Sequence, residues 1–255
     1  MKGIKEGHKH TFVDHGVYYL CDCGKRRLKL LDSKIEGLKY GTRKDGIKLT
    51  VRDDRSRYFF PTEWEIFYKE LKDKQKPVFD FLIQTGSRID ECLHTRPVDF
   101  DFDRNTVRLW KTKTKAKLNE RAGKPRTIVL SNAFMKRVRK YIRNQRLDEK
   151  SENYLFFGAT PGTFMTKASV FQLMKRKMFR AGIKDFYAFS LHNIRKTHGN
   201  WLKAIGVPAE EICLRLGHDF NTYLKHYGSA SIFSNQDLSM IRDIFDDLYQ
   251  QQRRF

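Results

Sequence analysis

The hydrophobic pattern of the chain changes its period close to residue 60. In "HTFVDHGVYYLCDCGKRRLKLL" and "GLKYGTRKDGIKLTVRDD" apolar and polar residues alternate, and glycine-containing turns separate the runs. Alternation of this kind is typical of short strands. We therefore predict a small, basic, β-rich module over residues 1–57.

From Pro61 onward the apolar residues recur at helical spacing. The segment "PTEWEIFYKELKD" predicts a first helix, with a capping box from Thr62 to Glu65 ahead of Phe67 and Leu71. "PVFDFLIQTG" predicts a second helix that ends near Gly86. Further helices are expected over "SNAFMKRVRKYIRNQ", "TKASVFQLMKRKMFRAG", "SLHNIRKTHGNWLKAIG", "PAEEICLRLG" and "NQDLSMIRDIFDDLYQQ".

A small antiparallel sheet interrupts the helices. "VDFDFDRNTVRLWKTK" predicts two strands joined at Asp103-Arg104-Asn105, and "PRTIVL" predicts a third. The fold class is therefore α+β, with a mainly helical domain over residues 58–255 that follows the β-rich module. The amphipathic helix at the C-terminus either docks onto a neighbouring subunit or packs against its own domain, and the sequence leaves both open.

The composition limits the compartment and the partners. The formal net charge is +21, which indicates a partner that is nucleic acid or an anionic membrane surface. We find no run of eighteen apolar residues and no signal peptide, so a soluble cytoplasmic protein without membrane association is expected. Cys92 and Cys213 lie in apolar helical contexts, which argues against a disulfide scaffold.

The basic residues are concentrated in one stretch. Between Lys111 and Lys140 the chain has eleven Lys or Arg residues and a single acid, Glu120. Such a run can be a solvated face. With the overall excess of positive charge, nucleic acid is the better explanation.

Several short motifs bring together residue types suited to phosphoryl transfer. "TGSRIDE" places Arg88 at the start of a helix with Glu91 one turn later, and "LHNIRKTH" places His192 and Arg195 three positions apart on one helical face. Arginine forks match the oxygens of a phosphate and stabilise the charge that they gather in the transition state. Histidine and lysine can move protons, and tyrosine can act as a nucleophile in such a cationic site.

Each of these residues also has an ordinary structural explanation. Helical arginines are commonly solvated, "LGH" can be a helix stop because Gly217 suits that position, and tyrosines near helix ends commonly pack. The ordered set is what distinguishes this chain. It resembles the tyrosine recombinase, or phage integrase, family over roughly residues 58–250, with the pattern Arg, Lys, His-x-x-Arg, His or Trp, then Tyr. The most specific stretches are "TGSRIDE", "SLHNIRKTHGNWL" and "GVPAEEICLRLGH".

The resemblance assigns a role to each matched residue. In that family the nucleophile typically lies nine residues after the histidine of the "LGH" stretch, and nine residues after His218 is Tyr227 rather than Tyr223. By the same matching, Arg88 and Arg195 would clamp the scissile phosphate, His192 would assist proton transfer, and His218 would donate to a phosphate oxygen. Glu91 would orient Arg88 or neighbouring groups. The family lysine is assigned to Lys113, with Lys111 as the fallback and Lys115 also open.

The resemblance implies a site-specific DNA recombinase or integrase. It would form a covalent 3′-phosphotyrosine and need no metal, ATP or other cofactor. Its partner would be double-stranded DNA at specific sites, bound by a homotetramer, and an accessory DNA-bending protein is compatible with it. The other expected DNA contacts come from the lysine-bearing hairpin: Lys111, Lys115, Lys117, Arg121, Lys124 and Arg126.

Two features depart from the family pattern. Members commonly carry a larger, helical N-terminal DNA-clamping domain, whereas residues 1–57 have a strand pattern. After Arg195 the chain has "KTHGNWL", where the family usually has "HTFA" or similar.

Other functions stay open at the sequence level. A type IB topoisomerase uses related chemistry, and a non-catalytic DNA-binding relative would carry the same charge. Zinc could bind His8, His10, His15, Cys21 and Cys23, although "CDC" is a poor match to the usual spacing. Two-metal chemistry needs clustered carboxylates, and the available acids read mostly as turn residues: Asp53, Asp54, Asp101 and Asp103.

Overall fold

The structure is a computed structural model that describes residues 58–111, 122–158, 163–183, 186–227, 233–246 and 248–249, together with short segments of the first 57 residues. The chain divides into two units, Met1–Asp54 and Arg55–Phe255, where the sequence places the boundary after residue 57. Each unit is described by itself.

The first unit consists of short antiparallel strands. One sheet has the order β1-β2-β3, and a separate pair joins β4 and β5. Their bounds are β1 Phe12–Asp14, β2 Tyr18–Cys21, β3 Arg26–Leu28, β4 Lys39–Thr42 and β5 Lys48–Val51. The proposed zinc ligands lie outside the described residues, except for the backbone of Cys21. In the described part of the chain, no group of three His, Cys, Asp or Glu residues could hold a metal ion.

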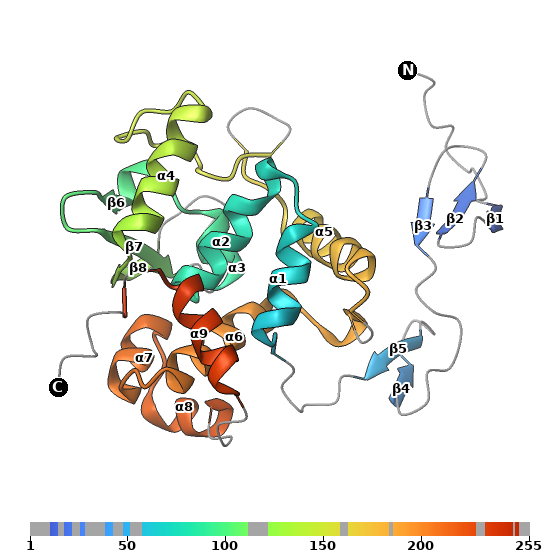
Figure 1. Ribbon diagram of the computed structural model, residues 1–255. Coiled ribbons are helices and arrows are strands. Elements are labelled where there is room, and N and C mark those ends of the chain that lie inside the picture. The colour runs from blue at the N-terminus through green and yellow to red at the C-terminus, as the bar shows by residue number, and fades with distance from the viewer. Residues whose placement is uncertain are drawn as a thin grey trace. The chain divides into compact units, whose positions relative to one another are not determined.

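The second unit is mainly helical (Figure 1). The helices are α1 Pro61–Lys69, α2 Lys76–Thr85, α3 Ile89–Leu93, α4 Asn132–Asn144, α5 Lys167–Arg180, α6 Leu191–Ala204, α7 Ala209–Leu216, α8 Phe220–Tyr227 and α9 Asn235–Ile244. Short 3-10 turns cover Asp73–Gln75, Pro97–Asp99 and Phe186–Ala188. The predicted helices are confirmed, and α8 adds one that the pattern did not predict. No helix of the described part is long and apolar enough to span a membrane.

The predicted cap of the first helix is wrong. Helix α1 begins at Pro61, because proline at the first helical position has a φ suited to the helix and lacks only an N–H that would be unpaired there. The residue three positions after the cap is therefore Glu63, not Glu65. The Glu63 carboxylate accepts a hydrogen bond from the Phe60 backbone N–H at 2.9 Å.

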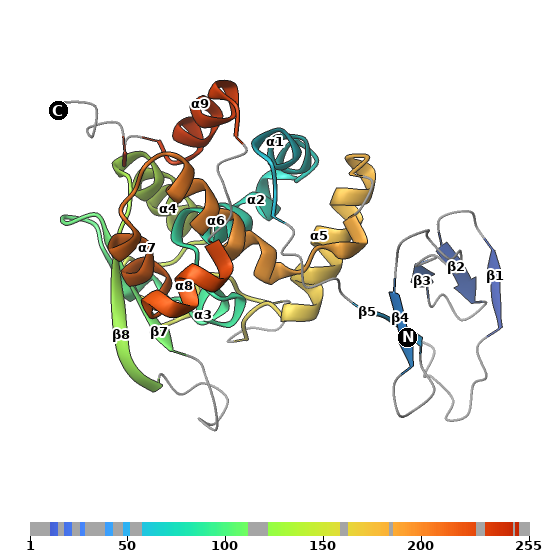
Figure 2. The same cartoon turned by 90° about the horizontal axis from the view of Figure 1, so that it is seen from below.

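A three-stranded antiparallel sheet, in the order β6-β7-β8, lies beside the helices. Strands β6 (Phe100–Asp101) and β7 (Thr106–Lys111) meet at the predicted turn, where Asn105 adopts a φ of 52°. The Asp101 carboxylate accepts the backbone N–H groups of Asp103 and Arg104, so it serves the turn. Strand β8 (Ala122–Val129) pairs with β7, and Figure 2 places the two strands beside α3 and α7.

Helix α6 is the central element of this unit. It contacts α2, α7, α8 and α9, and its Trp201 is fully buried. The entering segment is hydrogen-bonded to the same helix: the Phe59 N–H donates to Thr197 Oγ1 at 2.9 Å, and Trp201 Nε1 donates to the Phe59 carbonyl at 3.0 Å. The residues of α6 that the sequence assigns to chemistry therefore stand on a packed core.

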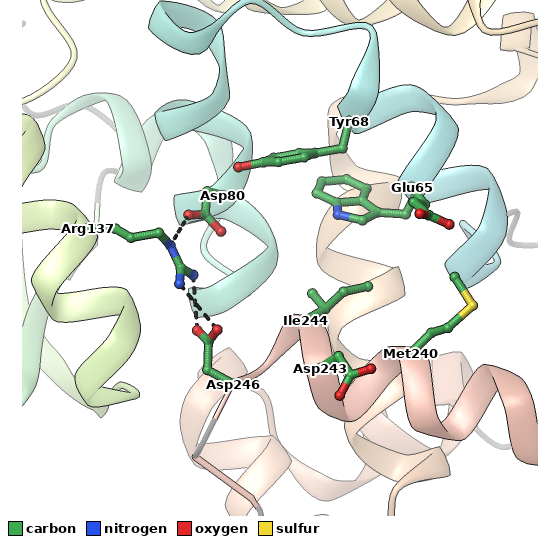
Figure 3. Close-up of a pocket in the computed structure, with 9 residues that line it drawn as sticks. Glu65, Tyr68, Asp80, Arg137, Met240, Asp243, Ile244 and Asp246 are labelled. Carbon is green, nitrogen blue, oxygen red and sulfur yellow. Dashed lines mark hydrogen bonds and ion pairs between the residues drawn. The ribbon is translucent and has the colours of Figure 1, made fainter.

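The C-terminal helix α9 packs against its own domain. Ile241 and Phe245 have no exposed surface. Just beyond the helix, Asp246 accepts two hydrogen bonds from Arg137 of α4 at 3.0 and 3.2 Å, and Arg137 also donates to Asp80 of α2 at 3.0 Å (Figure 3). Of the two arrangements that the sequence left open, this structure has the intramolecular one.

A cavity of about 580 Å³ lies between α1 and α9. Figure 3 shows its lining residues, with Arg137, Asp80 and Asp246 on one side and Glu65 and Met240 on the other. Trp64 and Tyr68 of α1 also line it. The candidate residues for phosphoryl transfer do not line it. The cavity therefore belongs to the packing of α9.

We predict that Phe245→Ala destabilises the protein by about 3–5 kcal/mol, because it removes a buried ring and leaves a cavity. That ring meets His198, Trp201 and Tyr249 edge to face. Urea unfolding followed by circular dichroism measures the change in the free energy of unfolding. Phe220→Ala is the control, because Phe220 is 52% exposed, and its effect should stay within about 0.5 kcal/mol. Equal effects of the two substitutions would contradict intramolecular packing of the C-terminal segment.

Candidate active site

A sharp turn between α2 and α3 places Arg88 at the start of α3. Gly86 ends α2 with a φ of 60°, a conformation that favours glycine. A Cβ atom at this position would lie 2.4 Å from Cδ2 of His198. Backbone conformation and space therefore both require glycine here, and Arg88 follows as the N-cap residue of α3.

Glu91 joins Arg88 to a second arginine. Its Oε2 accepts the Arg88 backbone N–H at 2.9 Å, and its Oε1 accepts Arg88 Nη1 at 3.0 Å. Arg126 of β8 donates Nη1 to Oε1 at 3.0 Å and Nη2 to Oε2 at 2.6 Å. The Glu91 side chain is 1% exposed and that of Arg88 is 29% exposed. A buried carboxylate thus holds two guanidinium groups, and the Arg88 group reaches the surface.

The charge of Glu91 is fixed by these arginines. Burial by itself raises the pKa of the carboxyl group, because it removes water from the charged form. The hydrogen bonds and charge of Arg126 outweigh burial, and the Arg88 N–H and the charge of Arg195 add to them, so that the pKa of Glu91 is lowered to about 2. Glu91 is therefore ionised at neutral pH.

Arg195 of α6 is held by backbone carbonyl groups. It is 1% exposed, its Nη1 donates to the Gly86 carbonyl at 2.8 Å, and its Nη2 donates to the Leu216 carbonyl. A buried guanidinium needs such acceptors, because desolvation of the charge is costly. These bonds place Arg195 between the turn that carries Arg88 and the end of α7.

His218 lies next to Arg195. The distance from Arg195 Nη2 to His218 Nε2 is 2.8 Å. A guanidinium can only donate hydrogen bonds, so Nε2 accepts. The residue expected to donate to a phosphate therefore accepts from Arg195 in this structure.

The C-terminal end of α7 collects these interactions. Gly217 ends the helix with a φ of 60°, and carbonyl groups of the last turn of a helix have no partner within it. Leu216 gives its carbonyl to Arg195, and Arg215 gives its carbonyl to Arg126 Nε at 2.8 Å. The negative end of the helix dipole also favours cations at this position. One helix terminus therefore orients an arginine of α6 and an arginine of β8.

Two buried residues under this site, Arg215 and His198, were not predicted from the sequence. Arg215 donates to the Val129 carbonyl at 2.8 Å and to the Gln84 carbonyl at 3.1 Å. Nδ1 of His198 lies 2.6 Å from the Ile83 carbonyl and therefore donates to it, and burial lowers the pKa of His198 well below its usual range. A signal was available for Arg215, since it occupies an apolar position of α7 between the buried residues Ile212 and Leu216.

Comparison with protein families decides the identity of this unit. The model of the phage integrase family matches residues 61–231, which contain every residue of the site. The chain belongs to the phage integrase family. The resemblance to this family that the sequence motifs indicated is confirmed.

Solved structures of similar fold are recombinases and integrases. The XerA recombinase superposes with a TM-score of 0.57 at 18% identity, over 80% of this chain and 67% of that one. The Tn1549 transposon integrase in complex with circular intermediate DNA gives 0.56 at 19% identity, over 70% and 64%. The XerH site-specific recombinase bound to difH substrate gives 0.53 at 16% identity, over 74% and 56%. At these identities the likeness establishes the fold.

This integrase-family chain spans between 56% and 67% of the length of those three structures. None of the curated proteins compared with it matches.

The two tyrosines of the integrase-family chain lie in different surroundings. Tyr223 is 6% exposed, and burial raises the pKa of its phenol. The packing role expected for Tyr223 is consistent with this burial. Tyr227 is the last residue of α8, and its side chain lies outside the described part of the structure. Its assignment as the nucleophile stays a prediction.

The remaining predicted residues are placed only in part. His192 is exposed on α6, one turn before the buried Arg195. Only the backbones of Lys111 and Lys124 are described, in β7 and β8. The rest of the hairpin residues lie outside the described part: Lys113, Lys115, Lys117 and Arg121.

The Arg126 side chain, which the sequence suggested as a DNA contact, is bonded within the site in this structure. Its side chain is 15% exposed, and its Nε, Nη1 and Nη2 donate to Arg215 and Glu91. The physical reason is the buried Glu91 carboxylate, which requires a bidentate cation. A run of basic residues in the sequence gave no sign of this partner.

We predict a pH-dependent contribution of Glu91 to stability. Its folded-state pKa of about 2 lies below the ordinary 4.5, so the stabilisation is full above the ordinary pKa and is lost as pH falls toward the folded one. The lowered pKa corresponds to about 3 kcal/mol. Urea unfolding of the wild type and Glu91→Gln from about pH 7 to about pH 3 measures it. The wild type's advantage should shrink as pH falls, and an advantage independent of pH would contradict the ion pair.

Proposed function

We propose that this chain is a site-specific DNA recombinase or integrase that breaks and rejoins DNA strands through a covalent tyrosine link. The observation that carries the proposal is the arrangement of Arg88, Arg195 and His218 around the turn after α2 and the end of α7, within a chain of the phage integrase family. The two guanidinium groups support binding of a phosphate, and Glu91 holds Arg88, whose side chain is 29% exposed.

The proposed reaction is a transesterification. The Tyr227 oxygen attacks the scissile phosphorus, an O–P bond forms to the tyrosine, and the bond from phosphorus to the 5′ oxygen of the next nucleotide breaks. The tyrosine loses its proton and the departing 5′ oxygen gains one. Rejoining to a partner strand reverses these steps with a 5′ hydroxyl as the nucleophile. The number of phosphodiester-type bonds is unchanged, so ATP is not required.

Each basic residue has a role in this reaction. The guanidinium groups of Arg88 and Arg195 would bind the non-bridging oxygens and stabilise the negative charge of the transition state. His192 would assist removal of the proton from Tyr227, and Lys113 would protonate the departing oxygen. Nε2 of His218 accepts from Arg195, so this nitrogen would have to gain a proton, by tautomer exchange or by protonation of the ring, to donate to a phosphate.

Double-stranded DNA at specific sites is the proposed partner, bound by a homotetramer. The solved XerH structure contains its difH substrate, and the Tn1549 integrase structure contains circular intermediate DNA. The net charge of +21 supports the same kind of partner. The same proposal places the protein on nucleoid, viral or plasmid DNA. An accessory DNA-bending protein is compatible with it.

We predict that Tyr227→Phe abolishes a covalent adduct that Tyr223→Phe retains. Nicked suicide substrates, selected from random or host-derived DNA, trap the adduct, and denaturing electrophoresis without added metal detects it. Tyr223→Phe removes only a buried hydroxyl and keeps the ring, so it should leave a folded, active protein.

Other outcomes separate the alternatives. Loss of the adduct only in Tyr223→Phe would mean that the spacing argument chose the wrong tyrosine. Tight, salt-sensitive DNA binding without any adduct would support the non-catalytic relative. Relaxation of supercoils without a target sequence would support the type IB topoisomerase.

A further inference from the structure

We propose that Arg126 is a positioning residue of the active site, which holds the Arg88 guanidinium in place through Glu91 and fastens strand β8 to the end of α7. The inference rests on the proposed function, since it gives Arg126 a part in the same reaction. It replaces the DNA contact that the sequence alone suggests for this residue.

The first step is the contact of Arg126 with Glu91. Nη1 and Nη2 of Arg126 donate to Oε1 and Oε2 of Glu91 at 3.0 and 2.6 Å. The same Oε1 accepts Arg88 Nη1, and the same Oε2 accepts the Arg88 backbone N–H. A carboxylate held at both oxygens by a planar fork cannot rotate freely, so the Arg88 side chain bound to it is oriented as well.

The second step is the contact of Arg126 with α7. Its Nε donates to the Arg215 carbonyl at 2.8 Å. The next carbonyl, that of Leu216, accepts from Arg195, which in turn contacts His218. One side chain therefore joins the turn that carries Arg88 to the helix terminus that orients Arg195 and His218.

The third step is the position of Arg126 in the sheet. It lies in β8 opposite Leu109 of β7, on the strand that leads back from the hairpin with the candidate lysines. A side chain anchored at Glu91 and Arg215 fixes this strand to α3 and α7. The position of β8 relative to the two arginine motifs thus depends on Arg126.

Arginine suits this role better than lysine. A guanidinium has donors in one plane that can satisfy a carboxylate with two of them and a carbonyl with a third, whereas an ammonium is a single point of charge on a flexible stem. Arg126→Lys should therefore keep the charge but lose the geometry, and Arg126→Met should lose both.

The experiment separates positioning from DNA contact by measuring binding and chemistry on the same suicide substrate. The variants are Arg126→Lys, Arg126→Met, Glu91→Gln and the double variant Arg126→Met/Glu91→Gln. Arg139→Met is the matched control, because Arg139 lies on α4, outside the site, and pairs with the half-exposed Glu149. Circular dichroism first identifies the variants that fold. DNA affinity as a function of salt and the single-turnover rate of adduct formation are then measured.

A positioning residue affects the rate and not the binding. We expect Arg126→Met to slow adduct formation about 100-fold, which is the cost of a misplacement near 1 Å, with the DNA dissociation constant and its salt dependence unchanged. Arg126→Lys should recover part of the rate. The double variant should react at nearly the rate of the slower of the two single variants, because both substitutions break the same contact between Arg126 and Glu91. Arg139→Met should react at the wild-type rate.

The pH profile of the reaction is a readout that general destabilisation would not change. The charged and titratable groups near Glu91 are Arg88 on α3, Arg126 on β8, Arg195 on α6 and the neighbouring Cys92. Without Arg126 the buried carboxylate protonates at a higher pH. The rate of Arg126→Met should therefore fall on the acidic side and recover as pH rises, and the double variant should lack this added limb.

Three results would overturn the inference. In the first, Arg126→Met binds DNA more weakly and with a shallower salt dependence, but the bound complex reacts at the wild-type rate. Arg126 would then be a phosphate contact. A wild-type rate and pH profile in a folded Arg126→Met would make the contact dispensable. A wild type that forms no adduct would overturn the proposed function itself, and this proposal with it.

Discussion

The structure of the site depends on the backbone carbonyl groups that accept hydrogen bonds from two buried arginine side chains. Arg195 is 1% exposed, and it donates to the backbone carbonyls of Gly86 and Leu216. Arg215 beside it donates to the carbonyls of Val129 and Gln84. Buried charge of this kind is tolerated only where acceptors are already in place. These hydrogen bonds therefore join the end of α2 and the turn after it to the end of β8 and the end of α7.

That requirement couples stability to chemistry. The same turns that satisfy buried arginines also place Arg88 at the surface and His218 against Arg195. The end of α9 closes the opposite side, with the Phe245 ring on His198 and Trp201 and the Arg215 guanidinium 5.9 Å from the centre of the Tyr249 ring. The C-terminal segment therefore completes the packing on which the site stands.

Local patterns were sufficient for most elements and for the family. Helical spacing predicted α2, α6 and α7, and the glycines at positions 86 and 217 marked the ends of α2 and α7. The ordered motifs indicated the phage integrase family that the family model confirms. The predicted capping box of α1 failed, because a proline at the first helical position moved the cap by two residues, from Thr62 to Phe60. The burial of Tyr223 agrees with the packing role that spacing gave it.

By itself, the sequence determined the class of fold, the family and the order of the chemical groups, because these follow from residue type and spacing along one chain. It could not determine which cation meets which anion. Arg126 and Glu91 are 35 positions apart, and neither local periodicity nor charge distinguishes Arg126 from the basic residues around it. Only the tertiary structure, by burying Glu91 between α3 and β8, turned one of many surface-like arginines into an internal partner of the site.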